Sequence, residues 1–194
     1  VGTSYVAPVV ALTLPEPLVR LADAGPALGP LVPLADVLVP SSSVANPTVD
    51  GSCFTSLSEY ADATLLTLPI TLTGGSVQSI QLYLKHTATV VWACFDNLPL
   101  ATGALSPTNQ VAIYLHPNAS PPARPGAESK RFSIGQTGLT SVSRGGYGGT
   151  WTAWTEPIAS FTSARFVEDL DGVPILWSAE LRISRTAFNN MSWT

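Results

Sequence analysis

Prolines interrupt an otherwise apolar stretch over residues 1–40. Seven of them stand there, at positions 8, 15, 17, 26, 30, 33 and 40. Proline lacks a backbone N–H and clashes with the preceding helical turn, so this stretch forms neither one long helix nor a central strand. Because so apolar a segment needs to be buried, it packs either on its own domain or on another molecule.

The rest of the chain has the pattern of an all-β domain. Segments rich in β-branched and aromatic residues, often at every second position, are separated by Gly, Pro and Asp turns. The expected strands are 63–72, 79–85, 89–95, 110–116, 131–134, 151–154, 163–167 and 175–184. No helical spacing is long enough for a crossover helix. The sequence therefore predicts an antiparallel, jelly-roll-like β-sandwich over residues 48–194, preceded by an extended apolar arm over residues 1–47.

Charge is scarce in this chain and argues against two classes of partner. Charged residues make up 11% of the sequence, against a usual value of about 25%. The net charge is −4 and the arginines are scattered singly, so no basic stripe is present for a phosphate backbone and nucleic acid is not an expected partner. Proline or charge interrupts every long apolar run, so no membrane-spanning helix is expected.

Two features indicate an extracellular or cell-surface protein. The arm lacks the basic start and unbroken apolar centre of a signal peptide, and the chain opens with Val, so we expect a processed N-terminus. The two cysteines, Cys53 and Cys94, are too few for a structural zinc site. They form either a disulfide that clamps two strands or a pair of buried free thiols.

Three short motifs resemble the extracellular carbohydrate-binding domains of the family 9-like type, which are related in shape to DOMON domains. Residues 49–53 read Val-Asp-Gly-Ser-Cys, residues 59–63 read Glu-Tyr-Ala-Asp-Ala, and residues 177–184 read Trp-Ser-Ala-Glu-Leu-Arg-Ile-Ser. These match the family's opening "DG" turn, its "E-Y/W-x-x-A" segment and its "W-x-A-E-x-x-I" strand. Segments 82–86, 90–94 and 111–115 fit its central strands. The resemblance covers residues 49–183 and implies a β-sandwich whose relatives bind sugars or haem, or act as spacers.

Aromatic residues near position 150 are the candidates for sugar binding. A pyranose is bound by exposed aromatic faces flanked by polar groups. Tyr147, Trp151 and Trp154 supply such rings, with Glu156 and Arg144 as polar neighbours. The two tryptophans are three residues apart, however, so on a regular strand they face opposite sides. Packing of these rings in the core or in an interface is the alternative.

The carboxylates do not indicate an enzyme. The run 168–172 is the best candidate for calcium ligands, but acidic residues beside glycine are also ordinary turn residues. Glu180 lies in the strand that resembles the family's own, and we expect it to make a structural contact rather than to act as a catalytic acid. No nucleophile elbow, metalloprotease motif or phosphate loop is present. We therefore expect no catalytic residue, no bound metal and no cofactor.

The resemblance also bears on the arm. Domains of this type continue past the "W-x-A-E-x-x-I" strand, whereas here only eleven residues follow Ile183. A sandwich without its last strand exposes an apolar groove and unpaired backbone groups, which an extended segment can cover. The arm residues expected to do so are Tyr5, Val6, Val9, Val10, Leu12 and Leu14. Residues 19–39 are then a covering segment or a linker.

Three hypotheses follow. In the first, the protein is a secreted structural subunit whose arm completes the sandwich of the next copy, so that copies polymerise into an extracellular, pilus-like filament. In the second, it is a carbohydrate-binding module with the arm wrapped on its own domain. In the third, it is a spacer from a longer cell-surface protein. Asn118 and Asn190 are candidate glycosylation acceptors.

Overall fold

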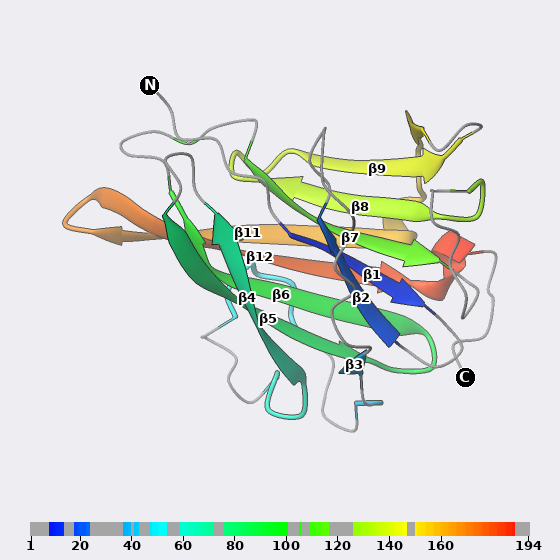
Figure 1. Cartoon of the computed structure of the whole chain (residues 1–194), viewed down its shortest axis with the longest axis horizontal. Helices are drawn as coiled ribbons and strands as arrows, with labels where there is room; N and C mark the ends of the chain where they lie inside the picture. The colour runs from blue at the N-terminus through cyan, green and yellow to red at the C-terminus, as the bar shows by residue number, and fades with distance from the viewer. Residues whose placement is uncertain are drawn as a thin grey trace.

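A computed structural model of the chain describes the residues of two packed β-sheets and their connections (Figure 1). The described residues are 8–13, 18–23, 37–39, 41–42, 47–53, 59–71, 76–100, 105, 109–116, 126–146 and 150–188. The predicted arm residues Tyr5, Val6 and Leu14 lie outside them. So do Tyr147, Asn118 and Asn190.

The strands form one sheet of seven and one of five. The order in the larger sheet is β10 (Trp151–Ala153), β9 (Thr140–Gly145), β8 (Lys130–Gly135), β7 (Gln110–His116), β1 (Pro8–Thr13), β2 (Leu18–Asp23) and β3 (Val37–Leu38). The order in the smaller sheet is β11 (Phe161–Leu170), β12 (Val173–Ser184), β6 (Val90–Pro99), β5 (Val77–His86) and β4 (Thr64–Thr71). Two short 3-10 helices, η2 (Ile158–Ser160) and η3 (Arg185–Phe188), flank β11 and β12.

The core lies between the two sheets and follows the alternation of the strands. Along β12, Trp177, Ala179, Leu181 and Ile183 are buried at every second position. They share one cluster with inward residues of both sheets, including Ile80, Leu82 and Leu84 of β5 and Val111, Ile113 and Leu115 of β7. The prediction of an all-β sandwich is confirmed.

The predicted arm contributes both strands and core to this fold. β1 and β2 pair antiparallel with each other, and β1 pairs parallel with β7. Val39 is 2% exposed and belongs to the main core cluster. The expectation that residues 19–39 are only a covering segment or linker is corrected at Leu18–Asp23, because these residues form strand β2 between β1 and β3.

A second, smaller core lies on the outer face of the five-stranded sheet, under the segment 47–63. Cys53 and Cys94 form a disulfide that joins this segment to the central strand β6. Around it pack Tyr60, Val90 and Trp92. Lys85 is fully buried, and its Nζ donates to the carbonyl of Glu59 and lies 3.3 Å from the Asp62 carboxylate. The disulfide and this lysine hold the segment on the sheet.

The carboxylate of Glu180 joins the three motifs that resemble the carbohydrate-binding domains. Its Oε2 accepts the backbone N–H of Asp50 at 3.0 Å and of Gly51 at 3.2 Å, and its Oε1 accepts the Tyr60 hydroxyl at 2.5 Å. The Ser178 hydroxyl donates to the Gly51 carbonyl at 2.6 Å. Glu180 is fully buried, so each of these donors satisfies a group that would otherwise be costly to bury. The role is structural, as its position in the strand predicts.

Glycine is required at one point of this network. Gly51 has a φ of 90°, and a Cβ there would stand 2.3 Å from the backbone carbonyl carbon of Arg165 on β11. The Asp50-Gly51 turn can therefore lie in direct contact with the β11 backbone while its N–H groups donate to Glu180. This geometry explains why the motif has glycine at its second position.

Glu180→Ala tests the network. It removes the acceptor of three donors, and a buried donor without an acceptor costs free energy, so we expect the free energy of unfolding to fall by about 3–5 kcal/mol. Glu180→Gln is the matched control. Its amide oxygen can accept the two N–H groups while its NH₂ donates to Tyr60, so we expect a loss of about 1 kcal/mol. Equal losses in the two variants, measured by denaturant unfolding, would contradict this role.

The pH dependence of stability gives an independent test. Burial raises the pKa of Glu180 above its ordinary value of 4.5, although the hydrogen bonds from Tyr60, Gly51 and Asp50 oppose the shift. The folded protein therefore keeps this proton to higher pH than the unfolded chain, and stability is lost as the pH rises from about 4.5 through the raised pKa. We expect the unfolding free energy of the wild type, minus that of Glu180→Gln, to fall over this range. If the unfolding free energies of the two proteins change with pH in parallel, the raised pKa of Glu180 is contradicted.

Candidate functional site

The junction between the arm and β7 is the first candidate site. β1 runs parallel to β7 with Val9 beside Ala112, Val10 beside Ile113 and Leu12 beside Leu115. Ile113 and Leu115 are 0% and 1% exposed. Three of the six arm residues predicted to complete the sandwich, Val9, Val10 and Leu12, thus lie in the strand that continues the sheet from β7.

β1 has a different place in the sheet from the one that its prolines suggest. The prolines predict no central strand in residues 1–40, yet β1 lies between β7 and β2, and β2 lies between β1 and β3. Pro8 is the first residue of the strand, where a missing N–H removes no hydrogen bond from the middle of the ladder. The following residues, Val9 to Thr13, have the N–H groups needed to pair on both sides.

Without β1, β7 would be the edge of its sheet. Its neighbour on the other side is β8, with the register Ile113 to Phe132 and Val111 to Ile134. The backbone of β7 that faces β1 would then be unpaired along a strand whose inward side chains are fully buried. The arm thus occupies an edge that the remainder of the sandwich leaves open.

A second candidate site surrounds the short edge strand β10. The Trp151 ring lies 5.1 Å from the Tyr114 ring in an edge-on contact, and the Arg131 guanidinium lies 5.8 Å from the centre of the Tyr114 ring. Burial raises the pKa of the Tyr114 hydroxyl, and the charge of Arg131 opposes part of this effect. Tyr114 is therefore a neutral hydroxyl at physiological pH.

Trp154 has other partners. The Arg144 guanidinium lies 4.1 Å from the centre of its ring and the Lys130 Nζ lies 5.6 Å from it. Lys130 in turn pairs with Glu156. Trp154 is 39% exposed, so part of the indole faces solvent beside two cations. Rings of this kind are common in recognition surfaces because a cation and an apolar face are presented together.

The structure therefore places the sugar-site candidates in two groups. Trp151 pairs in register with Gly145, and Thr152 pairs with Arg144, so the strand directs Trp151 and Thr152 to opposite faces. Trp154 lies on the same face as Arg144 and contacts Lys130, which pairs with Glu156. Trp151 lies on the other face and packs against Tyr114. The spacing of three residues predicts this separation.

The sequence patterns do not predict several residues of this second site. Lys130, Arg131 and Tyr114 lie on β7 and β8, far in sequence from the tryptophans. The one sequence signal is the scarcity of cationic residues. The whole chain has only nine lysines and arginines, and three of them fall within residues 130–144. Arg144 and Lys130 are register partners on β9 and β8, which brings two of these charges together.

Neither a metal-binding cluster nor a membrane-spanning helix is found among the residues described. There, no group of three or more His, Cys, Asp and Glu side chains is placed to hold a metal ion. Asp169 and Asp171 of the calcium candidate are exposed, and Asp171 and Gly172 have φ values of 54° and 77°, as in a tight hairpin turn. No helix in the described ranges is long and apolar enough to cross a membrane.

Comparison with known proteins adds one distant likeness. No protein-family model and no curated protein matches the chain. Among solved structures, a crystal structure from Bacteroides uniformis titled a "putative carbohydrate-binding protein" is 13% identical, with a TM-score of 0.48, over 75% of this chain and 71% of that one. The resemblance to family 9-like carbohydrate-binding domains therefore stays a prediction from the motifs.

Proposed function

We propose that this protein is a secreted, non-catalytic structural subunit that polymerises into an extracellular filament, with strand β1 of one copy pairing with β7 of the next. The observation that carries the proposal is the parallel pairing of β1 with β7. An arm strand, distant in sequence, completes the sheet there at an edge that the sandwich leaves open. A strand of this kind can be supplied by the same chain or by a neighbour.

The connection between the arm strands and the sandwich is long enough for such an exchange. Val39 is buried in the core, and the backbone N–H of Ser42 donates to the His86 carbonyl at 2.6 Å, so the chain is anchored at these two residues. Residues 24–36 join β2 to β3 and can span at most about 47 Å when extended. A domain of about 150 residues has a radius of gyration near 15 Å. The β1–β2 pair can therefore reach an adjacent copy.

Exchange of an arm strand leads to a fibre rather than to a closed dimer when each copy gives its arm to the next. The donated strand and the accepting edge are different surfaces, so the contact is heterologous and continues indefinitely unless a ring closes. The low charge of the chain is compatible with extensive contact between copies. The disulfide between Cys53 and Cys94 supports a location in an oxidising, extracellular compartment.

Carbohydrate binding is the second candidate, because one aromatic ring is suitably exposed. Trp154 presents part of its indole to solvent next to Arg144 and the Lys130–Glu156 pair. An indole face stacks on the apolar side of a sugar ring, and the charged groups can hydrogen-bond its hydroxyls. Trp151 packs against Tyr114 and is not needed for this contact.

A cysteine pair at the junction distinguishes exchange between copies from pairing within one. Val9 and Ala112 are register partners, and adjacent strands hold such residues within disulfide distance. We expect an equimolar mixture of a Val9→Cys protein and an Ala112→Cys protein, assembled and then oxidised, to give covalently linked copies on non-reducing gels. A protein with both substitutions, kept dilute, should close the link within one chain.

Two results would contradict the filament proposal. The first is assembly without any link between copies in the mixture, since the arm would then pair only within its own chain. The second is a wild-type protein that stays monomeric by sedimentation and electron microscopy at high concentration. Wild-type protein carried through the same oxidation is the control, because its cysteines are already paired.

Trp154→Ala tests the second candidate. If a glycan stacks on this ring, its loss should weaken binding to a responsive polysaccharide at least about tenfold, as expected for an aromatic contact worth 1.4 kcal/mol or more. Phe166→Ala is the matched control, because Phe166 is also an exposed aromatic residue but lies on β11. Equal affinities of the wild type and Trp154→Ala across a polysaccharide panel would exclude this site.

A further inference from the structure

In the part of the chain that the structure describes, the two sheets end in four edge strands, and three of these are poor templates for another strand. β3 has two residues and β10 has three. β4 contains Pro69, which has no backbone N–H to donate. Short strands and proline are common protections of a sheet edge. The fourth edge strand, β11, has ten residues and no proline, so it lacks both protections.

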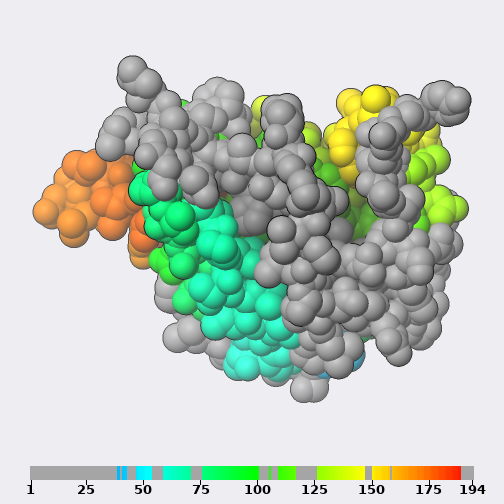
Figure 2. Space-filling view, in the orientation of Figure 1, coloured from blue at the N-terminus to red at the C-terminus, as the bar shows by residue number. Residues whose placement is uncertain are grey.

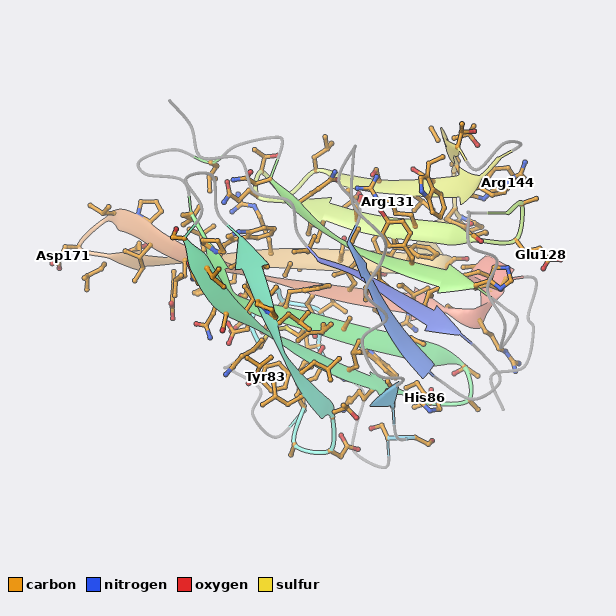
Figure 3. All side chains as sticks on the ribbon, viewed as in Figure 1. Tyr83, His86, Glu128, Arg131, Arg144 and Asp171 are labelled. Atoms are coloured by element: carbon orange, nitrogen blue, oxygen red, sulfur yellow. A yellow bond between two sulfur atoms is a disulfide. The ribbon has the colours of Figure 1, made fainter. Side chains whose placement is uncertain are left out.

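The free side of β11 is open to an approaching strand. β11 pairs with β12 on one side, and none of the described residues makes a backbone hydrogen bond to residues 162–170 on the other. The outer part of the β11–β12 hairpin extends beyond the body of the sandwich as the orange projection in Figures 1 and 2. Figure 3 shows Asp171 at the far end of this projection. A strand from another molecule can therefore reach this edge.

Side chains alternate along β11 between the core side and the solvent side of the sheet. Arg165 and Val167 are register partners of Ala179 and Trp177, which are 0% and 1% exposed, so both face the core side. By the same alternation Asp169 faces the core side, and the residues between these three face solvent. The core side of the free edge thus carries one cation and one anion, four residues apart.

Arg165 limits which strand can pair with this edge. Among the described residues, no carboxylate forms an ion pair with it. Its Nε lies beside the β8–β9 turn, where a Cβ on Gly138 would stand 3.3 Å from it. An inward-facing charge on an edge strand opposes pairing, because pairing would bury that charge without a partner. Only a strand that places an acidic residue opposite Arg165 avoids this cost.

We propose that β11 of one copy pairs antiparallel with β11 of a second copy, about a two-fold axis at Val167. A two-fold axis perpendicular to the sheet keeps the core-side residues of both copies on one face. In this register Arg165 of each copy lies opposite Asp169 of the other, so two ion pairs flank Val167. The strand supplies the complement of its own charge pattern, and the occupant of the edge is therefore another copy of the chain.

The same register covers apolar surface on the solvent side of the hairpin. Leu170, which is 63% exposed, lies opposite the small side chain of Ala164 of the other copy. Phe166, which is 46% exposed, lies opposite the stem of Glu168. Burial of part of these side chains adds to the backbone hydrogen bonds of the new strand pair.

Acidic residues of the two hairpins stay apart in this arrangement, with one exception. Each Asp171 lies opposite residue 163 of the other copy, so the two turns are separated by about 26 Å along the strands. The closest like charges are the two Glu168 carboxylates, which are exposed and two positions apart on the solvent side. Of two adjacent acidic residues, Asp169 thus stabilises the contact and Glu168 opposes it.

This contact is independent of the proposed filament. Both copies use the same strand, so the contact is isologous and closes with two copies. It involves neither β1 nor β7. Where the arm also links copies, the β11 contact joins two filaments side by side.

A cysteine on the proposed axis tests the register. In Val167→Cys the two new thiols are directly opposite each other, within disulfide distance on adjacent antiparallel strands. We expect linked dimers on non-reducing gels after mild oxidation of the dilute, folded protein. Ser163→Cys is the matched control, because it lies on the same side of β11 but its thiols are about 26 Å apart in a pair of copies. It should give at least about tenfold less linked dimer. Cys53 and Cys94 are already paired with each other.

Charge variants test the ion pairs by sedimentation equilibrium of the full chain. Arg165→Glu or Asp169→Lys alone places like charges opposite each other, so we expect the dissociation constant of the dimer to rise at least about tenfold. Both substitutions in one chain restore opposite charges and should restore the wild-type constant. Glu168→Gln removes the repulsion on the solvent side and should lower the constant. Unchanged thermal unfolding of each variant confirms that it is folded.

The outcomes separate this contact from the filament proposal. If Val167→Cys links no more than Ser163→Cys, or the doubly reversed variant stays as weak as the single ones while folded, the β11 contact is overturned, whether or not filaments form. If Val167→Cys links copies in pairs while the wild type never forms filaments, the filament proposal fails and the β11 contact stands. Linking at residue 167 together with rescue by the double reversal supports the contact.

Discussion

The buried carboxylate of Glu180 is the interaction on which the outer layer of this protein depends. It binds groups that are 120 to 130 residues distant in sequence, namely the Asp50-Gly51 turn and Tyr60. A buried charge is tolerable only when its acceptor sites are filled, so the segment 47–63 cannot leave the sheet without a large cost. The disulfide of Cys53 and the buried Lys85 fix the same segment at two further points.

This anchoring separates the chain into a firmly held part and a part held by strand pairing. In the described residues from Val39 onward, the chain is bound to the sandwich by core packing, hydrogen bonds and a covalent link. The strands β1 and β2 are joined to it through a stretch of thirteen residues, 24–36, and through the sheet. The proposed strand exchange between copies would need these two parts to separate from each other.

Much of the fold could be predicted from the sequence because it follows local rules. Alternation and turn residues locate β4 to β8 and β10 to β12 closely but miss β9, and the Asp171-Gly172 turn is recognisable from its two residues. The opposite directions of Trp151 and Trp154 follow from their spacing. The predictions of side-chain direction need only the alternation of side chains along a strand.

Other features depend on contacts between distant segments. The prolines around β2 hide a strand that pairs with β1 on one side and with β3 on the other. The stacking of Arg144 on Trp154 and the burial of Lys85 depend on which strands become neighbours, which no local pattern encodes. The Glu180 network could be predicted in part. The order of the motifs indicates that they come into contact, but it does not indicate the hydrogen bonds.

The parallel pairing of β1 with β7 in a single chain has a kinetic consequence. A strand tethered to its own sandwich competes for its own edge at an effective concentration on the order of millimolar. A neighbour's identical strand gains nothing by replacing it unless the exchange adds a further contact. In the proposed filament, each copy would be capped by its own strand when dilute, and growth would require a partner that already presents a matching end. Nucleation would be slow and elongation at existing ends fast.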